Sequence, residues 1–144
     1  MKYDLRERVI DKLNELAVHI NRMNSIKVKD PVTYEKADVT VKYATERNLQ
    51  LVSDIELDVL VLLYKKFGTE VAGSPSSMFA SLKPMLGNKL VESFNKRRDL
   101  RNKLVHVYKE FSFDKEVFEQ SKNMGDVDEF IKEIKKSIAK HDTD

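Results

Sequence analysis

Apolar residues recur at steps of three and four along most of this chain, which is the period of an α-helix with one buried face. A first helix is predicted from Tyr3 to Asn24, with one apolar face formed by Leu5, Val9, Leu13, Leu16, Ile20 and Met23. Asp30 followed by Pro31 is typical of an N-cap with proline at the first helical position. One long second helix is predicted from there to Phe67, with core positions Ala37, Val41, Ala44, Leu51, Ile55, Val59 and Leu62.

Glycine and proline divide the next part of the chain. Residues 68–77 contain Gly73 and Pro75, so this is the most loop-like stretch, and a short helix is expected from Ser74-Pro75 to Pro84 or Gly87. Asn88 is the expected cap of another helix that reaches Lys109. Its apolar side consists of Leu90, Phe94, Leu100, Leu104 and Val107.

The last part of the chain predicts two more helices. A short one runs from Asp114 to Lys122, and residues 123–125 break it. Asp126 and Glu129 form an acidic capping box that opens a final amphipathic helix. Because no segment favours a strand and the connections are short, the sequence predicts an all-α fold with antiparallel neighbouring helices.

Length and composition bound the class of protein. A chain of 144 residues is expected to form one domain, residues 1–144. It has no cysteine, which excludes disulfides and cysteine-ligated metal sites. No apolar run reaches the roughly 18 residues of a transmembrane helix, and the N-terminal sequence lacks the apolar segment of a signal peptide. These features predict a cytoplasmic protein with no membrane partner.

Positive charge is concentrated between Lys96 and Lys109. This window has six Lys/Arg residues against one acid, Asp99, a net charge of +5, whereas the whole chain has a formal net charge of +2. Such a concentration is what a phosphate-binding surface needs. The alternative interpretation of a charge run alone is a solvated helix face.

Within this window Arg101, His106 and Tyr108 have the spacing R-x4-H-x-Y. Arginine binds phosphate through paired hydrogen bonds, and the ordinary pKa of histidine suits proton transfer near neutral pH. At about 100° per residue, Asn102 shares a helix face with His106, and Arg101 shares another with Tyr108. One straight helix therefore does not direct Arg101 and His106 at the same phosphate. The arginine would have to curl round the helix, or a two-fold partner would have to bring a second motif helix alongside.

The motif and its surroundings resemble the HEPN superfamily, specifically the HepT-like toxins of HEPN–MNT toxin–antitoxin pairs. The resemblance covers residues 3–138 and rests on Arg101, Asn102, His106 and Tyr108, together with the regions Glu46–Gln50, Glu56 and Asp58, Met78–Leu82, Asp114–Phe118 and Phe130. It implies an up-down four-helix bundle with additional short helices, and a homodimer with its active site in the cleft between protomers. It also implies a cognate MNT-type nucleotidyltransferase antitoxin that transfers AMP to Tyr108.

The sequence therefore predicts a toxin that is a metal-independent endoribonuclease acting on mRNA or tRNA. His106 is the expected general acid/base and Arg101 the catalytic phosphate clamp, and Asn102 is expected to orient His106. AMPylation of Tyr108 would block the entry of phosphate by charge and volume. No cofactor is expected, and no metal, because the three histidines lack ligand spacing with acids.

RNA-backbone contacts are expected from Lys96, Arg97, Arg98 and Lys103. Asp99 departs from the small and apolar pair that the family often carries before the arginine, and it is positioned to compete with phosphate for Arg101.

Two questions stay open at the level of sequence. The polar stripe Glu46, Gln50, Asp54 and Asp58 is either the wet face of an amphipathic helix, the favoured interpretation, or a source of carboxylates (Glu46 and Asp54) that orient Arg101 or Arg97. The alternative functions are a HEPN module that binds nucleotide or RNA without cleaving it, and a helical protein-interaction module.

Overall fold

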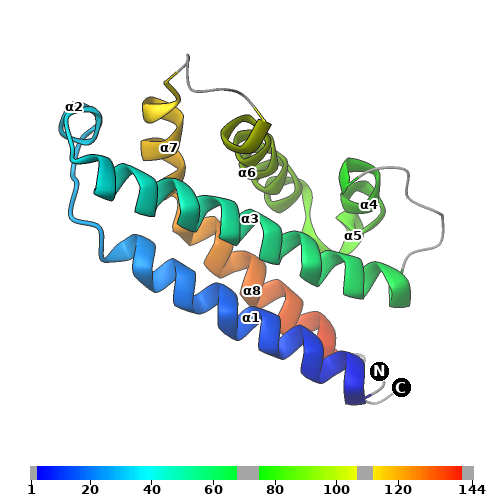
Figure 1. Ribbon diagram of the computed structural model, residues 1–144. Coiled ribbons are helices and arrows are strands. Elements are labelled where there is room, and N and C mark those ends of the chain that lie inside the picture. Colours follow the sequence, from blue (N-terminus) through cyan, green and yellow to red (C-terminus); the bar gives the residue numbers. More distant parts are fainter. Residues whose placement is uncertain (1–2, 68–74, 107–111, 141–144) are drawn as a thin grey trace.

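The computed structural model describes residues 3–67, 75–106 and 112–140, and within these ranges all regular structure is helical (Figure 1). The helices are α1 (Tyr3–Asn24), α2 (Pro31–Glu35), α3 (Val39–Phe67), α4 (Pro75–Ser81), α5 (Lys83–Leu86), α6 (Asn88–His106), α7 (Asp114–Ser121) and α8 (Met124–Lys140). The predicted all-α fold is confirmed. Among the described helices, none is long and apolar enough to cross a membrane.

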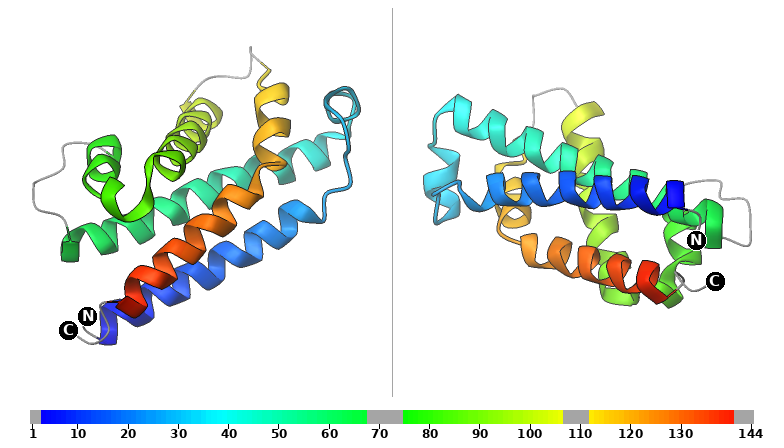
Figure 2. Two further views of the ribbon diagram at one scale, coloured as in Figure 1. Left: turned by 180° about the vertical axis from the view of Figure 1, so that it is seen from behind. Right: turned by 90° about the horizontal axis from the view of Figure 1, so that it is seen from below.

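Four long helices form the bundle. Helix α1 packs against α3 and α8, and α6 packs against the same two helices from the other side. The start of α1 and the end of α8 lie side by side, and successive long helices run in opposite directions (Figures 1 and 2). The short helices cover the ends of the bundle, since α2 packs on α7, and α4 and α5 lead into α6.

The core follows the predicted apolar face of α1 closely, because Val9, Leu13, Leu16, Ile20 and Met23 are all buried. In α3, Ile55, Val59 and Leu62 are buried as predicted, but Ala44 is exposed. Helix α3 contacts α1 on one side and α6 on the other. It therefore buries a wider arc than a single stripe, which adds Leu49, Val52, Leu60 and Leu63 to the core.

The predicted helix from Asp30 to Phe67 is wrong in one respect, because it is two helices. The carboxylate of Asp30 accepts the backbone N–H of Thr33 at 2.8 Å, which confirms it as the N-cap of α2. Helix α2 ends at Glu35, and α3 begins at Val39. The break covers residues 36–38, and the carboxylate of Asp38 accepts the backbone N–H of Thr40 at 3.4 Å, which favours a new helix start at this point.

The last helix begins at Met124, two residues earlier than the predicted capping box allows. Asp126 accepts hydrogen bonds from the hydroxyl of Ser93 on α6 and from the side chain of Asn123, both at 2.9 Å. Burial alone would raise the pKa of Asp126, but these hydrogen bonds and neighbouring positive charge hold the pKa below its ordinary value. A contact between helices has thus replaced the predicted local capping role.

Candidate functional site

Helix α6 carries every predicted site residue except Tyr108, which lies outside the described residues together with the predicted helix end at Lys109. Leu90, Phe94 and Leu100 are buried and fix this helix against the bundle. Its final turns hold the motif, and α6 ends at His106 in the described part of the chain. The orientation of the motif is therefore set by how the apolar side of α6 packs.

Arg101, Asn102 and His106 lie within the last two turns of α6. His106 and Asn102 are exposed, whereas the side chain of Arg101 is 21% exposed. Arg101 Nη1 donates to Asn102 Oδ1 at 3.4 Å, a long hydrogen bond. The contact of Asn102 is thus with Arg101, and the orientation of His106 by Asn102 stays a prediction.

Asp54 on α3 is the residue that joins two arginines of α6. Its Oδ1 accepts from Arg98 Nη1 at 2.8 Å and from Arg101 Nε at 2.9 Å. The structure thus places Asp54 in contact with Arg101, as the second interpretation of the polar stripe expected, although the wet face was the favoured one. Asp58, one turn further along α3, is exposed and pairs with Lys12 on α1 at 3.3 Å, as a wet face would.

Arg97 corrects the sequence prediction. It is only 3% exposed, and its Nε and Nη2 donate to the two carboxylate oxygens of Glu56 on α3, each at 2.7 Å. Its third nitrogen, Nη1, donates to the hydroxyl of Ser93. Because the guanidinium group is buried and each of its three nitrogens donates inside the bundle, the predicted contact of Arg97 with the RNA backbone is wrong. The pair joins α3 to α6.

The sequence contained a signal for this buried pair that was overlooked. Arg97 follows Leu90 by seven residues and Phe94 by three, so it continues the apolar side of α6. Glu56 follows Val52 by four residues and is 0% exposed. A charged residue at the buried period on each of two neighbouring helices indicates an internal ion pair, because a buried charge needs a partner.

The remaining basic residues differ in their surroundings. Lys96 is exposed. Lys103 pairs with Glu116 on α7 at 3.3 Å and lies 5.8 Å from the centre of the Phe113 ring. The hydrogen bond and charge of Glu116 raise the pKa of Lys103. Asp99, which was expected to compete with phosphate for Arg101, instead pairs with Lys103 at 3.5 Å.

The described residues contain no group of three or more His, Cys, Asp or Glu side chains that could hold a metal ion. His19 is buried on α1, and its Nδ1 lies 3.0 Å from the side-chain oxygen of Asn48 on α3. This histidine therefore belongs to the packing of α1 on α3. His141 lies outside the described residues.

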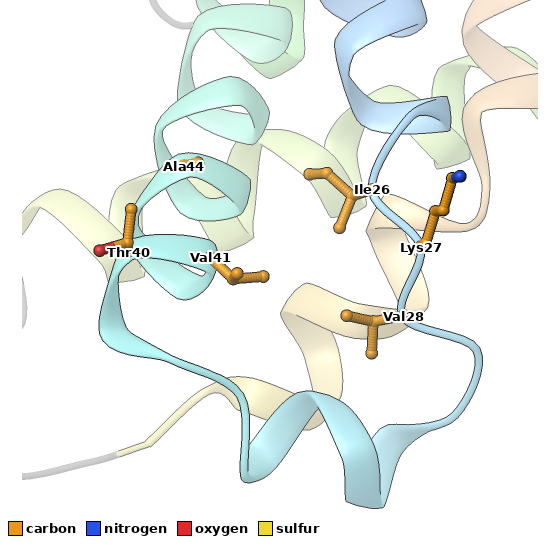
Figure 3. A pocket seen from close by; sticks show the side chains of 6 residues that line it. All are labelled: Ile26, Lys27, Val28, Thr40, Val41 and Ala44. Carbon is orange, nitrogen blue, oxygen red and sulfur yellow. The ribbon is translucent and has the colours of Figure 1, made fainter.

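A pocket of about 420 Å³ opens between the segment after α1 and the first turns of α3 (Figure 3). Ile26 and Val28 on one side face Val41 on the other, and Lys27, Thr40 and Ala44 complete the lining. Among the described residues, Arg101, Asn102 and His106 do not line it. The apolar pocket and the arginine cluster of α6 are thus separate features of the surface.

The comparisons with known proteins find two solved structures with this fold. The chain shares the fold of a tri-AMPylated HEPN toxin from Shewanella oneidensis in complex with an MNT antitoxin, with 24% identity, coverage of 94% of this chain and 98% of that chain, and a TM-score of 0.77. A toxin–antitoxin structure with AMP-PNP aligns with 22% identity over 88% of this chain and 96% of that chain, with a TM-score of 0.76. No curated protein matches the chain.

The family comparison covers nearly the whole chain. A family model described as Ribonuclease HepT-like matches residues 7–136, which include the motif, all of α3 and α6 and most of α1 and α8. The resemblance that the motif indicated is thereby confirmed. This chain belongs to the HepT-like family of the HEPN superfamily.

Proposed function

We propose that this chain is the toxin of a toxin–antitoxin pair and that it cleaves RNA without a metal ion, through Arg101 and His106. The observation that carries the proposal is the R-x4-H-x-Y spacing at the end of α6 in a chain of the HepT-like ribonuclease family. His106 is exposed, as a residue that must reach a large substrate needs to be. The toxin from Shewanella oneidensis, which shares the fold, supports the assignment.

The proposed reaction is attack by a ribose 2′-oxygen on the adjacent phosphorus, which breaks the bond from phosphorus to the 5′-oxygen. His106 takes the proton of the 2′-hydroxyl as general base. Arg101 stabilises the negative charge that develops on the phosphoryl oxygens. The departing 5′-oxygen needs a proton, and the His106 of a second copy would supply it. Neither step requires a metal ion.

A homodimer fits the direction of these side chains. Arg101 and His106 are five residues apart, so they project roughly 140° apart round one helix. Two copies related by a two-fold axis would place two such helices side by side and surround one phosphate from both.

Regulation by a nucleotidyltransferase antitoxin of the MNT type completes the proposal. Tyr108 follows His106 by two residues and is the proposed acceptor of AMP. An attached AMP would add a negative charge and a large group next to His106, and both would repel an incoming RNA phosphate. The tri-AMPylated state of the Shewanella toxin and the AMP-PNP in the second toxin–antitoxin structure support this idea.

The experiment is cleavage of total RNA in the presence of EDTA by the wild type, His106→Ala and His141→Ala. We expect fragmentation by the wild type and by His141→Ala, which removes a histidine outside the motif, and none by His106→Ala. Sequencing of the fragment ends then identifies mRNA or tRNA as the target. Intact mass spectrometry establishes whether the protein carries AMP. Absence of cleavage by protein free of AMP would contradict the proposal and favour an RNA-binding HEPN module.

A further inference from the structure

The contacts of Asp54 on α3 point beyond the motif itself. We infer that Asp54 is a positioning residue that holds Arg98 and Arg101 together, so that both guanidinium groups bind one RNA phosphate at the cleavage site. This inference rests on the proposed function, and it adds two residues to the site. It assigns Arg98 to the reacting phosphate instead of the flanking RNA backbone, and it gives Asp54 a role in aiming the arginines.

Arg98 and Arg101 share one carboxylate oxygen of Asp54. Arg98 Nη1 and Arg101 Nε both donate to Asp54 Oδ1, at 2.8 and 2.9 Å, so these two nitrogens lie within about 6 Å of each other. Two positive charges at that separation repel each other. A carboxylate between them offsets the repulsion and keeps both side chains on the side of α6 that faces α3.

Both arginines keep N–H donors that the contacts with Asp54 do not use. A guanidinium group has five N–H donors, and the contacts with Asp54 engage one nitrogen of Arg98 and one of Arg101. Arg101 points its Nε at Asp54, and within the described residues its terminal nitrogens make one long contact, with Asn102 at 3.4 Å. Fixing one edge of a guanidinium group in this way prepares the other edge for an anion.

The cluster of Arg98, Arg101 and Asp54 has the charge and the solvent access that binding of a phosphate requires. Arg98 and Arg101 contribute two positive charges and Asp54 one negative charge, so the cluster keeps a net charge of +1, opposite to a phosphodiester. The side chains of Arg98, Arg101 and Asp54 are 18%, 21% and 36% exposed, so a ligand can reach them from solvent. The cluster is part-buried, so it combines a contact between α3 and α6 with access for a ligand.

Arg97 supplies the internal comparison. It too pairs with a carboxylate of α3, but both oxygens of Glu56 and all three of its own nitrogens are engaged, and the pair is buried. Because Arg97 is only 3% exposed, a ligand in solvent cannot reach it. At Asp54, by contrast, each arginine uses one nitrogen and the side chains are partly exposed. A phosphate can therefore accept hydrogen bonds from the remaining N–H donors.

Asp54 is expected to affect RNA binding and the rate of cleavage in opposite directions. Its negative charge weakens the attraction of the cluster for RNA, whereas its hydrogen bonds orient Arg101 for the transition state. Replacement of Asp54 by the isosteric asparagine removes the charge and loosens the orientation. The variant should therefore bind RNA at least as tightly as the wild type and cleave it more slowly.

The kinetic test compares Asp54→Asn with Asp58→Asn, an exposed carboxylate one turn along the same helix. We expect kcat of Asp54→Asn to fall by about tenfold or more with KM unchanged or lower, because a less well oriented Arg101 stabilises the transition state less. We expect Asp58→Asn to match the wild type, and Asp54→Glu to recover part of the lost kcat. Equal kcat for Asp54→Asn and the wild type, or a lowered melting temperature together with raised KM, would overturn the inference.

A second readout does not depend on cleavage. The Nε–Hε resonances of the arginines are followed by NMR while inorganic phosphate is added, with Arg98→Ala and Arg101→Ala used to assign them. We expect both resonances to shift with one apparent affinity in the wild type and with two in Asp54→Asn. Independent responses in the wild type would refute the two-arginine site. If wild-type protein free of AMP cleaves no RNA but the two resonances respond together, the proposed function fails and the phosphate site stands.

Discussion

Two arginines of α6, four residues apart, both pair with carboxylates of α3, but they differ in burial and in the hydrogen bonds that they make. Arg97 and Glu56 are buried and engage each other through two hydrogen bonds of 2.7 Å. Arg101 shares a single oxygen of Asp54 with Arg98 at the edge of the same interface. The comparison teaches that the residue types of an ion pair do not determine its purpose. Burial and completeness of hydrogen bonding do, because they decide whether a donor remains for a ligand.

The largest effect is expected from breaking the buried pair. Glu56→Ala leaves the charge of Arg97 buried without its partner, which costs about 3–5 kcal/mol in the free energy of unfolding. Urea denaturation measures this, with Asp58→Ala on the exposed side of α3 as the control that should change by less than about 0.5 kcal/mol. The double variant Glu56→Leu with Arg97→Met should regain most of the loss. A stability of Glu56→Ala equal to that of the wild type would show that the pair is not formed in solution.

On the exposed side of the same interface, Arg101→Ala should act on the reaction rather than the fold. We expect the rate of RNA cleavage to fall by about 100- to 1000-fold, the usual effect of removing one donor to a developing oxyanion. The free energy of unfolding should change by less than about 1 kcal/mol, because the Asp54 pair is partly exposed. A loss of stability as large as that of Glu56→Ala would erase the difference between the two arginines.

A smaller effect should appear where the buried network continues onto α8. Asp126 has a lowered pKa in the folded protein, so its ionised form stabilises the fold above the ordinary pKa of 3.8, and this contribution is lost as the pH falls through the folded value. Asp126→Asn should cost about 1–2 kcal/mol near pH 7 and progressively less below pH 3.8. Denaturation of both proteins across that range tests this. A difference that does not depend on pH would indicate that the carboxylate charge plays no part.

The smallest effect concerns the lysines that flank the arginines. Lys96→Met should reduce the slope of log affinity for RNA against log salt by about one, as expected for one phosphate contact. Lys103→Met should reduce the slope by less, because Lys103 must first leave Glu116. Fluorescence titrations with an oligonucleotide that lacks the attacking 2′-hydroxyl would measure both slopes. An unchanged slope for Lys96→Met would place the RNA path away from this part of α6.

Local patterns predicted most of the elements. The bounds of α1, the Asp30 cap and the start of α6 at Asn88 agree with the apolar period and the capping residues. The break between α2 and α3 was missed because apolar residues continue at helical spacing through it. The start of α8 was misplaced because Asp126 binds Ser93 on another helix. Capping patterns are local, so they cannot anticipate a partner that arrives from elsewhere in the chain.

By itself the sequence determined the helical class, the positive charge of the motif region and the R-x4-H-x-Y spacing, because these depend only on residue types and their separation. The tertiary structure decided which arginine is internal and which is available. That choice depends on the register of α6 against α3, which sets Arg97 opposite Glu56 and Arg101 opposite Asp54. Register is fixed by the packing of many side chains at once, and no short pattern in either helix specifies it.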